Sequence, residues 1–230
     1  MVQVITQNER RTSVDEIFEE LHEQIVTLQL KPGDRISEAE IATRFSVSRQ
    51  PVRDAFSRLV NLDLLLIRPQ RATEVKRFSM RQIEKSRFIR SAIETEVLRR
   101  AAVLCNPDGE AQLKEALDEQ NAAGSMKDAD RFGQLDYQFH EILCGIAKVE
   151  YAFEIILAEK AKVDRLCMLG FEKEQRLPEL IDDHKKIADA VIAHDEDSAI
   201  AAGLKHLARL DSTIERITAT NANYFENTSS

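Results

Sequence analysis

The sequence predicts a mainly α-helical protein with a short β-hairpin in its N-terminal part. Apolar residues recur at helical spacing over residues 14–28, and long amphipathic segments with little proline or glycine follow residue 79. Between these regions, two short runs of β-forming residues at 62–67 and 73–76 flank a polar turn. These observations favour a small mixed domain followed by an all-α bundle.

Three helices are expected before the hairpin. The first covers residues 14–28 and ends at the turn formed by residues 31–34. Ser37 and Glu40 form a capping-box pattern that opens the second helix. The third helix begins with the segment SRQPVR at residues 48–53. Together with the hairpin, these helices predict a winged helix-turn-helix, whose third helix enters the major groove of DNA.

The start of the third helix carries side chains suited to nucleic acid. Arg49 and Arg53 can bond guanine edges or phosphates, and Gln50 can bond adenine. Arg68 or Arg71 in the turn of the hairpin can grip the flanking phosphate backbone. The alternative interpretation is a solvated basic face, because charged helix starts are common.

The charge along the chain supports this division. Residues 31–77 hold ten Lys or Arg against six Asp or Glu, whereas residues 79–230 hold 20 against 28. The positive charge therefore lies beside the expected DNA-reading helix, which is where phosphates need it. We expect domains at residues 1–77 and 78–230.

The sequence also predicts where the protein works. No stretch approaches the roughly 18 uninterrupted apolar residues of a spanning helix, and the N-terminus lacks the apolar core of a signal peptide. We therefore expect a cytoplasmic protein without a membrane partner.

Six helices are expected in the C-terminal bundle. Capping residues or proline mark their starts, near Ser79, Asn106-Pro107, Asp128, Glu150, Pro178 and Asp195. The tail from Asn221 is rich in Asn, Thr and Ser, and we expect it to fray.

The bundle also contains candidate metal ligands. Asp136 and His140 are four residues apart and so share one helix face, while His184 and His206 lie on later expected helices. Three imidazoles and a carboxylate can hold zinc, nickel, iron or cobalt if folding brings them together. The alternative for the Asp-x-x-x-His pair is an ordinary capping or core role.

A metal with open positions attracts an oxygen-rich anion, and a small carboxylic acid fits that description. Arg90 on the first bundle helix is a candidate partner for the second carboxylate oxygen, and Arg165 is a candidate from its helical position alone. The alternative for Arg90 is an intrahelical pair with Glu94.

The segments 30–38, 41–42 and 47–55 closely resemble the winged-helix domain of GntR-family transcriptional regulators, over about residues 14–77. The resemblance implies DNA contacts by one set of residues, with the wing tip in the minor groove: Arg35, Ser48, Arg49, Gln50, Pro51, Arg53 and Arg71. The family usually has glycine at the wing tip after a basic residue, whereas here Arg71 is followed by Ala72.

The segments 90–94, 136–140, 183–184 and 206–207 look like the helical ligand-binding domain of the FadR branch of that family. The resemblance implies a divalent metal held by Asp136, His140, His184 and His206, with Arg90 as a ligand contact. Zinc is the favoured metal, with nickel, iron, manganese or cobalt as alternatives. The chain length and six expected helices resemble the VanR-type subgroup.

The sequence therefore predicts a ligand-responsive transcriptional regulator, in particular a repressor that binds a palindromic operator in double-stranded DNA as a homodimer and senses a small organic acid. A metal-dependent hydrolase or lyase is the rival hypothesis, but no general base is expected beside the metal, so we do not predict an enzyme. A third hypothesis is a sensor of the metal alone.

Overall fold

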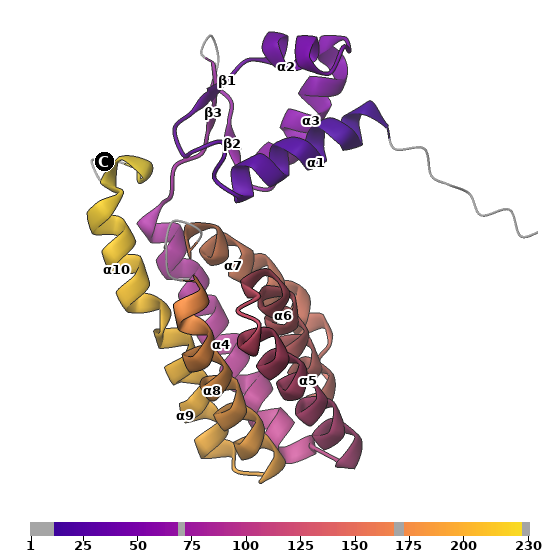
Figure 1. Ribbon diagram of the computed structural model, residues 1–230, viewed down its shortest axis with the longest axis vertical. Helices are drawn as coiled ribbons and strands as arrows, with labels where there is room; N and C mark the ends of the chain where they lie inside the picture. The colour runs from indigo at the N-terminus through magenta and orange to yellow at the C-terminus, as the bar shows by residue number, and fades with distance from the viewer. Residues whose placement is uncertain (1–11, 69–71, 168–172, 227–230) are drawn as a thin grey trace, which may run out of the picture. The chain divides into compact units, whose positions relative to one another are not determined.

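The computed structural model describes residues 12–68, 72–167 and 173–226, which form two compact units (Figure 1). Of these described residues, the first unit contains those up to Phe78 together with residues 223–226, and the second unit contains those between Ser79 and Ala222. We expected the whole region after residue 77 to form one domain, but the last described residues pack within the first unit instead.

The first unit contains three helices, α1 (Ser13–Val26), α2 (Glu38–Arg44) and α3 (Arg49–Asn61). A reciprocal cap starts α1, because the Thr12 hydroxyl accepts a 3.3 Å hydrogen bond from the Asp15 N–H while the Thr12 N–H donates to the Asp15 carboxylate. Two otherwise unsatisfied amides are thereby paired at the helix start.

An apolar cluster holds α1 against α3. Both helices contribute side chains at helical spacing that are fully buried: Ile17, Leu21, Ile25, Val52, Ala55, Phe56 and Leu59. One face of α3 is thus committed to the core, and its opposite face remains exposed.

A three-stranded antiparallel sheet completes the helix-turn-helix. Its strands are β1 (Arg35–Ile36), β2 (Leu65–Leu66) and β3 (Thr73–Val75), in the order β1-β3-β2. The hairpin formed by β2 and β3 was predicted, whereas β1 was not, because two residues are too short to show an alternating pattern. The sheet fixes Arg35 opposite Glu74 in β3.

The second unit is all-α, and Figure 1 shows most of its helices running side by side. Its helices are α4 (Met80–Leu104), α5 (Pro107–Ser125), α6 (Ala129–Ile146), α7 (Tyr151–Cys167), α8 (Lys173–Ile192), α9 (Glu196–Ala208) and α10 (Leu210–Thr220), followed by the short 3-10 helix η1 (Ala222–Tyr224). Helix α4 packs against α6, α7, α8 and α9, so it lies at the centre of the unit. No helix of the described part is long and apolar enough to cross a membrane.

The helix boundaries differ from the prediction in two places. The last expected helix is divided at Arg209, whose N–H bonds the carbonyl of His206 in a tight turn between α9 and α10. Helix α8 begins at Lys173 rather than near Pro178. Pro178 is the sixth residue of α8, so the helix contains an interior proline and lacks one backbone hydrogen bond there.

The expected caps also divide into two groups. Asn106, Asp128 and Asp195 each accept a hydrogen bond from the backbone N–H three residues later. Ser37 and Ser79 occupy N-cap positions without a side-chain cap bond, so the capping box predicted at Ser37 is not formed.

The C-terminal tail is ordered through Glu226, and the expectation that it frays from Asn221 is wrong for these residues. The Phe78 N–H donates to the Tyr224 carbonyl at 2.9 Å, and the Glu226 N–H donates to the Phe78 carbonyl at 2.8 Å. The rings of Phe78 and Phe225 lie 5.7 Å apart and both are buried. Backbone pairing and apolar burial together hold the tail on the first unit.

Candidate functional site

The start of α3 forms an exposed polar surface on the first unit. Ser48, Arg49, Gln50 and Arg53 are exposed, and Pro51 is half-buried. Ser48 occupies the N-cap position of α3, but its side chain makes no cap bond. The first backbone N–H groups of α3 are therefore left without a side-chain cap.

Local partners hold two of these side chains. Arg53 Nε lies 2.9 Å from Glu38 Oε2 on α2, and Gln50 Nε2 lies 2.9 Å from Asp54 Oδ1 one turn along α3. Both pairs are exposed, so exchanging them for DNA atoms costs little. Arg35 is exposed on β1, whereas the wing residue Arg71 lies outside the described residues.

Arg58, further along α3, connects α3 to α1. Its guanidinium lies 4.0 Å from the centre of the Phe18 ring, and Nη1 bonds Asp15 Oδ1 at 2.8 Å. Hydrogen bonds from Thr12, and then from Arg58, lower the pKa of Asp15 to about 2. These contacts with α1 account for the position of the Arg58 side chain, so no contact with DNA is needed to explain it.

The four candidate metal ligands converge inside the second unit. Asp136 and His140 lie one turn apart on α6, His184 lies on α8 and His206 on α9. Each offers one oxygen or nitrogen, and these four atoms lie within 4.8 Å of one another. All four residues are buried. A capping role is therefore excluded for Asp136 and His140, which lie in the middle of their helix.

Side chains outside the four candidate ligands fix the orientation of two of the histidine rings, those of His140 and His184. His140 Nδ1 lies 3.1 Å from Glu94 Oε2 on α4, and His184 Nδ1 lies 2.8 Å from Gln120 Oε1 on α5. Because both oxygens accept, each ring donates from Nδ1, which directs its Nε2 away from these partners. The Phe139 ring stacks on His184 with centres 4.4 Å apart, which fixes the plane of that imidazole.

Three histidine nitrogens of the cluster are buried without a hydrogen bond among the described residues, although His184 Nε2 lies 3.3 Å from Asp136 Oδ1. Among the described residues, no hydrogen-bond partner exists for His140 Nε2, His184 Nε2 or His206 Nδ1, although all three are buried. Burial lowers the pKa of His184 and, together with the neighbouring imidazoles, holds that of His206 well below its ordinary value. Buried imidazole nitrogens that make no hydrogen bond, grouped around a carboxylate, are the donors that a divalent metal takes, so this donor set fits one.

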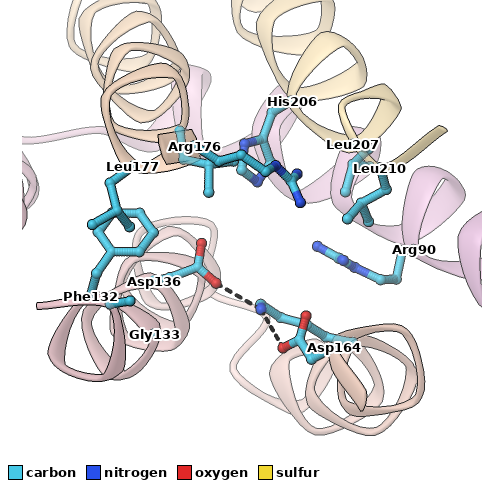
Figure 2. Close-up of a pocket in the computed structure, with 13 residues that line it drawn as sticks. Arg90, Phe132, Gly133, Asp136, Asp164, Arg176, Leu177, His206, Leu207 and Leu210 are labelled. Carbon is cyan, nitrogen blue, oxygen red and sulfur yellow. Dashed lines mark hydrogen bonds and ion pairs between the residues drawn. The ribbon is translucent and has the colours of Figure 1, made fainter. Parts of the chain in front are cut away.

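A lysine that the sequence did not indicate lies against Asp136. Lys160 Nζ on α7 is 2.7 Å from Asp136 Oδ2 and 2.6 Å from Asp164 Oδ2 (Figure 2). Burial alone would lower the pKa of Lys160, but the two carboxylates raise it above its ordinary value. Burial would raise the pKa of Asp136, yet Lys160 helps to hold it well below the usual range. Both groups are therefore charged.

A cavity of about 200 Å³ opens beside the cluster. Figure 2 shows Arg90 and Arg176 extending into the same space as Asp136, Asp164 and His206. Apolar side chains complete the lining: Phe132, Leu177, Leu180, Leu207 and Leu210. The cavity thus has both charged and apolar side chains in its wall, a lining that suits a small amphipathic anion.

The two candidate ligand-binding arginines differ in position. Arg90 lines the cavity, and it also makes the predicted intrahelical pair, with its Nε 2.7 Å from Glu94 Oε1. Arg165 is buried on α7 but does not line this cavity. Arg176 and Lys160 line it instead, and neither belongs to a pattern that sequence spacing could have revealed.

Comparison with known proteins matches residues 13–75 to the gntR family of bacterial regulatory proteins and residues 87–209 to the FCD domain. The HTH-type transcriptional repressor RspR of Escherichia coli K12 is 37% identical over 210 residues, which cover 91% of this chain and 92% of RspR. The HTH-type transcriptional regulator LutR of Bacillus subtilis 168 is 27% identical over 206 residues, 81% of this chain and 94% of LutR.

The fold also occurs in solved structures. The E. coli McbR/YncC structure superposes with a TM-score of 0.68 at 20% identity, over 90% of this chain and 99% of that one. The matching domains and relatives are DNA-binding regulators rather than enzymes, which removes the hydrolase or lyase alternative. The chain therefore belongs to the GntR family of transcriptional regulators, with a winged helix-turn-helix domain followed by an FCD domain.

Proposed function

We propose that this regulator is a cytoplasmic repressor that binds a palindromic operator as a homodimer and responds to a small carboxylic acid. The acid binds beside a divalent metal held by Asp136, His140, His184 and His206, with zinc favoured. One observation carries the proposal: three buried imidazole nitrogens that make no hydrogen bond among the described residues meet a carboxylate at the edge of a cavity that Arg90 also lines.

The donor set supports zinc and leaves a place for the acid. Three nitrogens and one carboxylate oxygen suit zinc, and the coordination sphere can expand to take an external oxygen. When bound, the metal supplies positive charge that draws a carboxylate into the cavity. Arg90 and Arg176 then lie within the same space to receive the remaining oxygens of the acid.

The repressor role draws on the relative RspR, which is named a repressor. A single winged helix reads only a few base pairs, so a two-fold symmetric dimer supplies the contacts that an operator requires. In this proposal, DNA is contacted by Arg35, Ser48, Arg49, Gln50, Pro51, Arg53 and, on the wing, Arg71.

A histidine variant tests the metal site. We expect His206→Ala to lower zinc affinity by about 100-fold or more, beyond the cost of losing an outer partner, and to abolish the effect of carboxylic acids on operator binding. His194→Asn is the matched control, because His194 is exposed at a turn with a φ of 57°, a conformation that asparagine tolerates. Zinc titration and fluorescence anisotropy with operator DNA provide the two readouts.

Two results would contradict this proposal. Wild-type zinc affinity equal to that of His206→Ala would remove the metal site. An operator affinity that responds to zinc alone, with no further response to any acid, would instead make the protein a metal sensor.

An arginine variant tests the DNA surface. We expect Arg49→Ala to weaken operator binding by about 1–3 kcal/mol and to relax the preference for one base, because Arg49 lies at the exposed start of α3. Arg99→Ala is the control, since Arg99 is exposed on α4 and pairs with Glu96. Equal operator affinity for the Arg49 variant and the control would place the DNA surface elsewhere.

A further inference from the structure

Acidic side chains in and beside the proposed metal site form ion pairs with basic side chains of the protein. The Asp136 carboxylate bonds the Lys160 ammonium at 2.7 Å, and the Glu94 carboxylate bonds the Arg90 guanidinium at 2.7 Å. The side chains of these four residues are at most 10% exposed, so water screens them little. The carboxylates nearest the cluster are therefore already neutralised by the protein.

This pairing determines how much of the charge of a bound metal the protein itself neutralises. A divalent ion adds two positive charges to a site in which the Asp136 carboxylate is already paired with the Lys160 ammonium. Asp164 is the additional carboxylate near Lys160, but its side chain is 38% exposed and it also accepts a hydrogen bond from the Tyr137 hydroxyl. Most of the charge of the metal is therefore left for an external anion to neutralise.

We propose that Lys160 sets the charge of this site so that the metal and an external carboxylate bind as a pair. The inference rests on the proposed metal site and adds a role for a residue outside the four ligands. By thermodynamic reciprocity, the acid strengthens metal binding by the same factor by which the metal strengthens acid binding. Lys160 thereby makes retention of the metal depend on the acid.

The geometry allows Lys160 to do this without blocking the metal. It bonds Asp136 Oδ2, whereas Asp136 Oδ1 faces His184 Nε2 at 3.3 Å and remains available to an ion between them. Lys160 also lines the cavity, so its charge acts on the acid as well as on the metal. Asp164 and the ring of Tyr137, 4.2 Å from Nζ, hold the ammonium in this place.

Substitutions that separate charge from hydrogen bonding test the inference. Lys160→Gln keeps a donor toward Asp136 but removes the charge, whereas Lys160→Arg keeps the charge. Zinc affinity is measured by competition with a chromophoric chelator, first in buffer free of carboxylates and then with acetate as the probe. Acetate is a simple carboxylate that a cavity of about 200 Å³ accommodates.

We expect acetate to raise the zinc affinity of the wild type by about tenfold, within the usual range of coupling between sites. Without acetate, Lys160→Gln should bind zinc about tenfold or more tightly than the wild type, because Asp136 regains its full charge. The effect of acetate on this variant should shrink toward none. Lys160→Arg should behave as the wild type does.

Asp164→Asn provides an independent test with the opposite sign. Because Asp164 is half-exposed, this variant is expected to fold even if Lys160→Gln does not. It leaves the site more positive, so zinc should bind more weakly without acetate and acetate should strengthen it by a larger factor than in the wild type.

The outcomes separate this inference from the proposed function. A wild type that fails to bind zinc would overturn the metal site itself. A wild type that binds zinc, beside a Lys160→Gln variant that binds it no more tightly or an Asp164→Asn variant that binds it no more weakly, would overturn only the role of Lys160. In that case Lys160 merely positions Asp136.

Discussion

Glu94 contacts two different partners of the proposed metal and acid site at once. Its Oε2 lies 3.1 Å from His140 Nδ1, and its Oε1 accepts from Arg90 Nε at 2.7 Å. Burial would raise the pKa of Glu94, but His140 and Arg90 outweigh this and lower it to about 2. The residue is therefore an anion at neutral pH, and it holds both neighbours in the orientation that the cavity requires.

Removing that charge should weaken metal binding. We expect Glu94→Gln to lower zinc affinity by about 10- to 100-fold, the usual cost of losing an outer partner of a metal-ligating histidine. Glu96→Gln is the matched control, because Glu96 is an exposed residue on the same helix that pairs with Arg99 and Arg100. Equal zinc affinities of the two variants would show that Glu94 does not orient His140.

Individual residues also show what a sequence can predict. The pair Arg90 and Glu94 was predictable because i,i+4 neighbours on a helix always lie close. Lys160 and Gln120 contact ligands that are 24 and 64 residues away in the chain, so only the packing of α5 and α7 brings them there. Outer partners of this kind have no spacing rule, and sequence analysis missed both.

The N-cap of α1 contrasts with that of α2, although both are hydroxyl residues. Thr12 is bonded in a reciprocal cap with Asp15, whereas Ser37 makes no side-chain cap bond. The Thr12 hydroxyl is also the largest influence that lowers the pKa of Asp15. One hydroxyl therefore stabilises a helix and the other does not.

We expect Thr12→Ala to reduce the free energy of unfolding of the first unit by about 0.5–2 kcal/mol, and Ser37→Ala to change it little. The pKa of Asp15 should rise from about 2 toward its ordinary value in the Thr12 variant alone. A lowered carboxylate pKa stabilises above the unfolded value, and this contribution is lost as pH falls through the folded value, so the part of the difference between the two variants that comes from the Asp15 carboxylate should disappear toward pH 2. Urea denaturation and an NMR titration measure these effects, and equal losses would contradict the account.

The angular spacing of residues around a helix explains which side chains of α7 line the cavity and which side chains of α6 share one face. Successive residues on a helix point about 100° apart, so Lys160 and Asp164 share the face that lines the cavity while Arg165 does not. Asp136 and His140 obey the same rule on α6, and their shared face was predicted. The positions of His184 and His206 depended on how α8 and α9 pack, which the sequence indicated only through its resemblance to a family.

At the scale of the whole molecule, residues near the C-terminus pack on Phe78, the last residue of the first segment of the winged-helix unit. Phe225 packs on Phe78 and is 7% exposed, and the Phe78 N–H bonds the Tyr224 carbonyl. The composition of the tail favoured fraying, because nothing in the sequence shows that Phe78 offers a backbone partner. Contacts between residues so far apart lie beyond any local pattern.

We expect Phe225→Ala to destabilise the first unit by about 1.5–3 kcal/mol, the value of burying one large apolar side chain. The Phe78 amide should then exchange with solvent faster, because its acceptor at Tyr224 is released. Glu226→Gln serves as the control, since the side chain of Glu226 is exposed while its backbone pairing is retained. Unchanged exchange at Phe78 in the Phe225 variant would disprove this role of the tail.

The tail is synthesised after the helices of the second unit, and this order determines when its pairing with Phe78 can form. Residues 79–222 are an insertion within the first unit, because residues 223–226 return to it. During translation, all seven helices from α4 to α10 have been made before the residues that pair with Phe78 emerge. A nascent chain thus acquires the backbone pairing of Phe78 only after the helices of the FCD domain have been synthesised, so a product truncated within that domain also lacks this pairing.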